Sequence, residues 1–62
     1  MENYKVTVTV RYPAWNERDG FTFYVEATSK AEAIKEARRQ NQRDGIVHRE
    51  HGPATWRAAI AD

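Results

Sequence analysis

In the stretch YKVTVTVRY, residues 4–12, apolar and polar residues alternate without a break, which predicts the first strand of a sheet. Successive side chains of a β-strand leave on opposite faces, and valine and threonine favour that conformation. The predicted strand therefore has one face for burial, formed by Tyr4, Val6, Val8, Val10 and Tyr12, and a polar face formed by Lys5, Thr7, Thr9 and Arg11. Pro13 has no amide hydrogen, so the strand is expected to end there.

The alternation resumes at residues 21–27, FTFYVEA, where Phe21, Phe23, Val25 and Ala27 form a second apolar set. Asp19 and Gly20 precede it and are typical of a turn, since glycine accepts a positive φ at no steric cost. The two strands are therefore predicted to pair as an antiparallel hairpin.

Residues 29–32, SKAE, match a helix-capping box, with Ser29 as the N-cap. The residues that follow are rich in helix formers, and Ala33, Ile34 and Ala37 share one face at helical spacing. Gly45 is the expected residue just past the end of this helix.

Residues 46–51 and 54–61 are predicted to be two further strands around Gly52 and Pro53, although the alanine-rich last segment is also compatible with a short helix. The expected fold is an α+β, two-layer ββαββ domain spanning residues 1–62, with one helix packed on one face of an antiparallel sheet. Strand order beyond the first hairpin stays open. The predicted core consists of Val6, Val8, Val10, Phe21, Phe23, Val25, Ile34, Ala37, Trp56 and Ile60.

Composition limits the possible functions. The chain has 62 residues, no cysteine and a formal net charge of +1. It contains no apolar run near the ~20 residues that span a bilayer, which predicts a soluble, cytoplasmic protein without a membrane partner. So small a core gains from a partner, and an unpaired strand edge makes a homodimer possible.

No catalytic or cofactor motif is present. Ser29 is the only serine and is assigned to the helix cap, and the acidic pair Glu17 and Asp19 lies in a predicted turn without an apolar wall. On a strand, His48 and His51 would point to opposite faces and could not share a metal ion. We therefore expect a protein that is not an enzyme and that holds neither a metal nor a cofactor.

Three surfaces are candidates for binding. The first is a basic helix stripe that consists of Lys35, Arg38, Arg39, Gln42 and Arg43, the first four at helical spacing. This stripe is either a solvated charged face or a surface that binds phosphates or acidic groups. The second is the open sheet face, a basic and threonine-rich surface that is either an ordinary polar face or one that lies on nucleic-acid backbones. Its expected members are Lys5, Thr7, Thr9, Arg11, Thr22, Tyr24, Arg49 and Arg57.

The third candidate is Trp15, in the loop PAWNERDG at residues 13–20. Its indole either folds back to cap the open end of the core or is exposed, in which case Arg11, Tyr12 and Arg18 would form its rim. Exposed tryptophan is strongly enriched at binding hot spots.

Residues 17–60 contain, in order, ERDG at 17–20, a short strand, ATSKAEA at 27–33 opening a single helix, GIV at 45–47, and a final strand with Trp56. In this layout they resemble some small phage anti-CRISPR proteins. Similar strand–helix openings occur in HicB-like antitoxins, but this chain lacks the Pro-Asp-Leu-Pro-Gly-Cys-like segment expected of them.

The resemblance implies stoichiometric inhibition of a type I, Cascade-like surveillance complex, a larger ribonucleoprotein of the host cell. Steric blockade is the expected mechanism, because a net charge of +1 does not provide a DNA-like acidic surface. The alternative is a small nucleic-acid-binding module that uses the basic helix face. The residues expected to contact a partner are Trp15, Arg18, Lys35, Arg38, Arg39, Arg43, Arg49 and Arg57.

Overall fold

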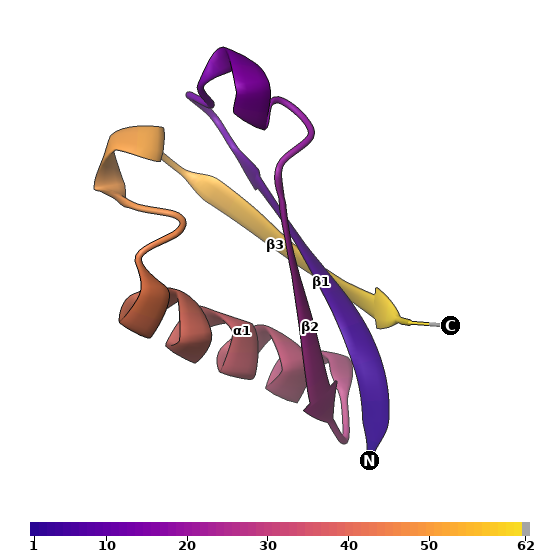
Figure 1. The fold of residues 1–62 in the computed structure, drawn as a ribbon. Helices are drawn as coiled ribbons and strands as arrows, with labels where there is room; N and C mark the ends of the chain where they lie inside the picture. Colours follow the sequence, from indigo (N-terminus) through magenta and orange to yellow (C-terminus); the bar gives the residue numbers. More distant parts are fainter. Residues whose placement is uncertain (62) are drawn as a thin grey trace.

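The computed structural model describes residues 1–61. Its elements, in chain order, are β1 (Glu2–Val10), the 3-10 turn η1 (Trp15–Glu17), β2 (Phe21–Ala27), α1 (Lys30–Asp44), the 3-10 turn η2 (Arg49–His51) and β3 (Ala54–Ile60). Within these residues the strands form one antiparallel sheet in the order β2-β1-β3, and α1 packs on one of its faces (Figure 1). The predicted α+β class is confirmed, but the order of elements is ββαβ.

The hairpin of β1 and β2 is confirmed, with Val8 opposite Phe21. On the other side of β1, Val8 lies opposite Trp56 of β3, so the last segment is a strand and not a helix. Strand β1 ends at Val10, two residues earlier than predicted. The reason is that the amide of Tyr12 leaves the ladder and donates to the carbonyl of His51, at 2.9 Å.

Ser29 and Gly45 cap α1 as predicted, but the capping box is only half formed, because the Glu32 carboxylate accepts from the Thr28 hydroxyl. The Ser29 hydroxyl oxygen accepts a hydrogen bond from the Glu32 amide at 3.2 Å, which satisfies one of the free donors of the first turn. At the other end Gly45 takes the left-handed conformation, with φ of 66°. Ala33 and Ala37 are fully buried against the sheet.

The predicted strand at residues 46–51 is wrong. The side-chain amide of Asn41 holds this segment instead: its Nδ2 donates to the Val47 carbonyl at 2.9 Å, and its Oδ1 accepts from the Val47 amide at 2.7 Å. After Val47 the chain turns into η2, where the amide of His51 donates to the carbonyl of His48. The amides of Val47, His48 and His51 are therefore used in local hydrogen bonds, while the carbonyl of His51 accepts from the amide of Tyr12.

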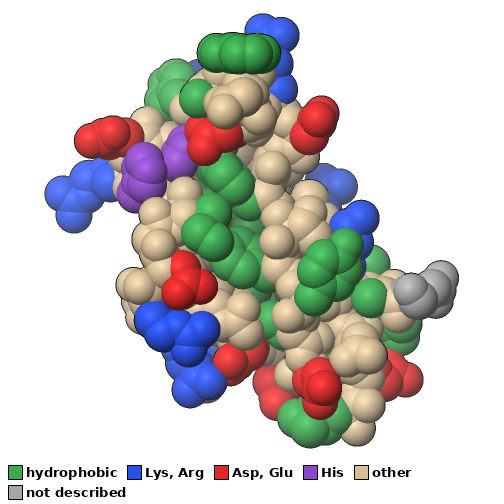
Figure 2. Space-filling model, in the orientation of Figure 1, with side chains coloured by type: hydrophobic (Ala, Val, Ile, Leu, Met, Phe, Trp, Pro, Cys, Tyr) green, Lys and Arg blue, Asp and Glu red, His purple; other side chains and the backbone are tan. Residues whose placement is uncertain are grey.

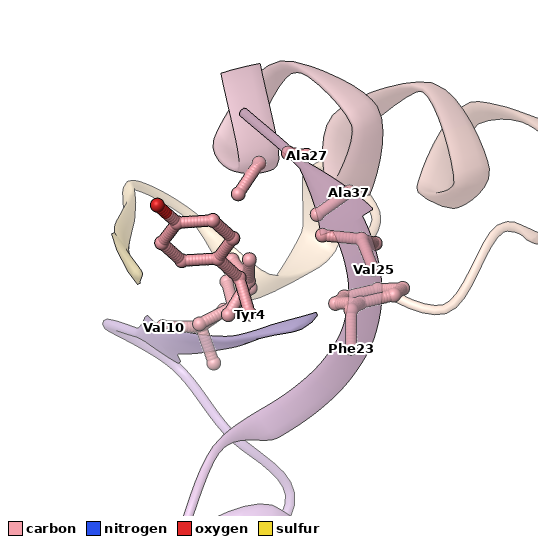
Figure 3. Packing of buried hydrophobic residues seen from close by; sticks show 9 residues of the cluster. Tyr4, Val10, Phe23, Val25, Ala27 and Ala37 are labelled. Carbon is pink, nitrogen blue, oxygen red and sulfur yellow. The ribbon is translucent and has the colours of Figure 1, made fainter. Parts of the chain in front are cut away.

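The core lies between the sheet and α1 (Figure 3). Val6, Val8, Val10, Phe23, Val25 and Ala37 are buried as predicted, and Tyr4, Ala27 and Ala33 join them. Phe21, Ile34 and Trp56 are half-buried against this cluster. The assignment of Ile60 to the core is wrong, since 53% of it is exposed, and Tyr12, also placed on the apolar face, is exposed. Within the described residues no helix is long and apolar enough to cross a membrane.

Candidate partner-binding site

The loop between β1 and β2 is folded by its own hydrogen bonds. The amide of Glu17 donates to the carbonyl of Ala14 at 2.8 Å, and the amide of Gly20 donates to the carbonyl of Glu17 at 2.9 Å. The Glu17 carboxylate also accepts a hydrogen bond from the amide of Ala14, at 3.1 Å. These contacts close η1 into a compact turn at the end of the hairpin, where Figure 2 shows hydrophobic side chains at the surface.

A contact between residues far apart in sequence ties this loop to η2. The Glu17 carboxylate lies 3.1 Å from Nε2 of His51, which is only 5% exposed. Nδ1 of His51 accepts from the amide of His48, also at 3.1 Å. In the neutral imidazole the proton is therefore assigned to Nε2, which donates to Glu17. The His51 ring also packs edge-on against Phe21, with 5.3 Å between ring centroids.

The same contacts lower the pKa of the Glu17 carboxyl group. The hydrogen bond from His51 and then that from the Ala14 amide hold the pKa of Glu17 below its ordinary value, because both stabilise the carboxylate. Glu17 is thus ionised at neutral pH and serves as an acceptor for both partners. Its role is to hold the loop in place.

Trp15 is 86% exposed, so the possibility that it caps the core is not realised. Tyr12 is 62% exposed. A Cβ added to Gly52 would lie only 2.6 Å from Cδ2 of Tyr12, so the Tyr12 ring can occupy its position only because residue 52 has no side chain. The Arg11 guanidinium lies 5.7 Å from the centre of the same ring, and Arg18 is exposed at the end of η1. We call Arg11, Tyr12, Trp15 and Arg18 the aromatic tip.

The basic helix stripe is exposed, but two of its arginines form ion pairs with neighbouring carboxylates. Arg39 forms an ion pair with Glu36 at 2.8 Å and Arg43 forms one with Asp44 at 3.4 Å. The Arg39 hydrogen bond is the main reason why the pKa of Glu36 is lowered. Arg38 lies over Trp56, 5.5 Å from the ring centroid.

A shallow groove along the outward side of α1 combines both signs of charge. Its lining includes Glu32, Lys35, Glu36, Arg38, Arg39 and Gln42. Because basic and acidic side chains alternate along it, this surface does not present the single-sign field that attracts a polyanion.

The open sheet face contains most of the residues expected on it. Tyr24 lies opposite Lys5, and Thr7 lies between Thr22 on one side and Arg57 on the other. Tyr24 is 69% exposed. Arg49 is not part of this face, because it lies in η2, at the end of the sheet that carries the aromatic tip.

The two histidines also differ from expectation. They do not point to opposite faces of a strand: their ring centroids lie 4.3 Å apart in and beside η2, and His51 is buried, not solvated. Both nitrogens of His51 are used in hydrogen bonds. Across residues 1–61, no three His, Cys, Asp or Glu side chains are grouped so as to hold a metal ion.

Trp15 lies in η1 with Arg18 as its C-cap, Arg49 lies in η2, and the Glu17–His51 contact links these two turns. The helix arginines lie on α1, away from the end of the sheet where Figure 1 shows η1 and η2. Sequence reasoning missed the tie between Glu17 and His51 and the clamp formed by Asn41. The only signal for the clamp was an asparagine that continues the apolar row of the helix, since such a polar residue needs a hydrogen-bond partner.

Comparison with known proteins gives no match to a family model, to a curated protein or to a solved structure.

Proposed function

We propose that this chain is a non-catalytic binding protein that inserts the aromatic tip into a pocket on a larger protein or ribonucleoprotein. The observation that carries the proposal is the exposure of Trp15 on a loop closed by hydrogen bonds. A preorganised loop loses little conformational freedom on binding, so more of the burial energy of an indole appears as affinity. Tryptophan and arginine are also the residue types that dominate binding hot spots.

The chemistry of the tip specifies the partner surface. A ring as exposed as Trp15 needs an apolar pocket, and Arg11 and Arg18 suit carboxylates at the rim of that pocket. In keeping with the resemblance to anti-CRISPR proteins, we propose a type I surveillance complex of the host as the target. The mechanism is steric blockade, because the chain carries a net charge of +1 and cannot imitate DNA.

The test is target-DNA binding by a purified type I complex, with and without an equimolar amount of this protein. Inhibition that saturates at equimolar ratio is expected, and Trp15→Ala should remove it. Tyr24→Ala is the matched control, since Tyr24 is an exposed aromatic residue on a different surface. Undisturbed DNA binding in the presence of excess protein would reject this target, and equal effects of the two substitutions would reject the tip.

The nucleic-acid-binding alternative has a more limited basis. Lys35, Arg38, Arg39 and Arg43 are exposed, as phosphate contacts require, but two of the arginines pair with neighbouring carboxylates. If this surface binds phosphates, affinity must fall steeply with salt, because each contact releases condensed counterions. A gel-shift titration at low and high salt measures this directly, and absence of any shift at low salt excludes the alternative.

A further inference from the structure

The apolar face of the sheet is unevenly covered. On β2 the inward side chains Phe23, Val25 and Ala27 are buried beneath α1. On β3 the corresponding side chains Trp56 and Ala58 are only half-buried, and Ile60 is exposed. The single helix therefore leaves apolar surface uncovered along one edge of the sheet.

The total surface area supports the same conclusion. The chain exposes 4830 Å², whereas a monomeric protein of 7.2 kDa is expected to expose about 4,100 Å². The difference, roughly 700 Å², is close to the ~800 Å² that each partner contributes to a standard interface. The chain as a whole therefore exposes about as much extra surface as one partner buries in a standard interface, and the uncovered apolar edge along β3 is part of it.

The backbone of β3 is also available for pairing. The amide of Ala61 donates to Asn3 at 2.9 Å, and the amide of Arg11 donates to Pro53 at 3.1 Å. In an antiparallel ladder such hydrogen-bonded pairs recur at every second residue. The odd-numbered residues of β3 therefore bond to β1, while Ala54, Trp56, Ala58 and Ile60 direct their backbone groups toward the free edge.

We propose that a second copy of this chain pairs with that edge, β3 against β3 in antiparallel orientation, with Ala58 on the twofold axis. This register joins even-numbered residues, as the free backbone groups require, and sets Trp56 opposite Ile60 of the second copy on the apolar face. Small Ala58 side chains meet at the centre. A register centred on Arg57 would set two arginines directly opposite each other, which is destabilising.

The pairing extends the sheet continuously through both copies and buries the exposed side chain of Ile60. Pro53 and the aromatic tip lie near the beginning of β3. Antiparallel pairing therefore carries the two tips to opposite ends of the dimer. Dimerisation through β3 does not require the proposed partner, so it can be measured on the protein alone.

Sedimentation equilibrium across a range of protein concentrations is the first test. Wild-type protein is expected to be a dimer that dissociates on dilution. Ile60→Glu should weaken the association by about tenfold or more, because each dimer then buries two unpaired charges. Tyr24→Ser, on the other face, should leave it unchanged. Ile60 is exposed in the single chain, so this substitution leaves the monomer folded, as circular dichroism would verify.

Cysteine cross-linking tests the register, and the chain has no cysteine of its own. Ala58→Cys places two thiols across the axis on Cα atoms about 5.5 Å apart, within the range of a disulfide. Oxidation should link this variant readily and link Ala59→Cys poorly, because residue 59 is then opposite residue 57. A monomer at all concentrations, or a dimer indifferent to Ile60→Glu, would overturn the proposal, and preferential linking of Ala59→Cys would overturn the register.

Discussion

The Asn41 side chain is the best place to test how the irregular segment after α1 is held. Its amide makes two hydrogen bonds to the backbone of Val47, at 2.9 and 2.7 Å, both partly buried. The substitution Asn41→Ala removes both and leaves the Val47 amide and carbonyl without these partners. Because the same segment leads into η2, its release should also loosen the support of the aromatic tip.

The magnitude follows from the two contacts. Each hydrogen bond contributes about 1 kcal/mol net, so their loss costs about 2 kcal/mol. Alanine is the better helix former by about 0.5 kcal/mol, so the free energy of unfolding should fall by about 1.5 kcal/mol. With an unfolding entropy of about 2.1 cal/mol/K per residue over 62 residues, Tm should fall by about 11 °C.

Urea and thermal unfolding, followed by circular dichroism, measure both quantities. Gln42→Ala is the matched control: it lies on the same turn of the helix, is exposed, and should change stability by less than about 0.5 kcal/mol. If Asn41→Ala were as stable as this control, the two hydrogen bonds of Asn41 would not be what holds the segment.

Three further substitutions test other parts of the structure. Val6→Ala opens a cavity at a fully buried position and should cost about 2 kcal/mol in urea unfolding, whereas Thr7→Ala should change stability little. Gly20→Ala should cost more than about 1 kcal/mol in thermal unfolding, because φ is 83° there and the added Cβ would collide with the Val8 carbonyl. The pKa of Glu17 is lowered from its ordinary value of 4.5, so the stability it contributes is present above that value and is lost as pH falls through the lowered pKa. Urea titrations at neutral and acid pH should therefore show a smaller loss of stability for Glu17→Gln than for the wild type, and equal losses would contradict this.

Local patterns predicted most of the regular structure. The alternation in residues 4–12 and 21–27 identified the hairpin, and Ser29 and Gly45 marked the ends of α1, because strand alternation and helix caps depend on neighbours in the chain. Prediction failed at residues 46–51. Ile46 and Val47 suggested a strand, but the hydrogen bonds of Asn41 were available to compete for the same backbone.

For the candidate binding surfaces too, local features could be predicted from the sequence and long-range contacts could not. A tryptophan and two arginines around one turn, the basic side of the helix and the apolar face of β1 could all be predicted, since each property belongs to a short stretch of chain. The exposure of Trp15, the burial of His51 against Glu17 and the uncovered edge of β3 beside β1 follow from the three-dimensional fold. Those outcomes depend on contacts such as the one between residues 17 and 51, and no local pattern specifies which distant group will meet a given side chain.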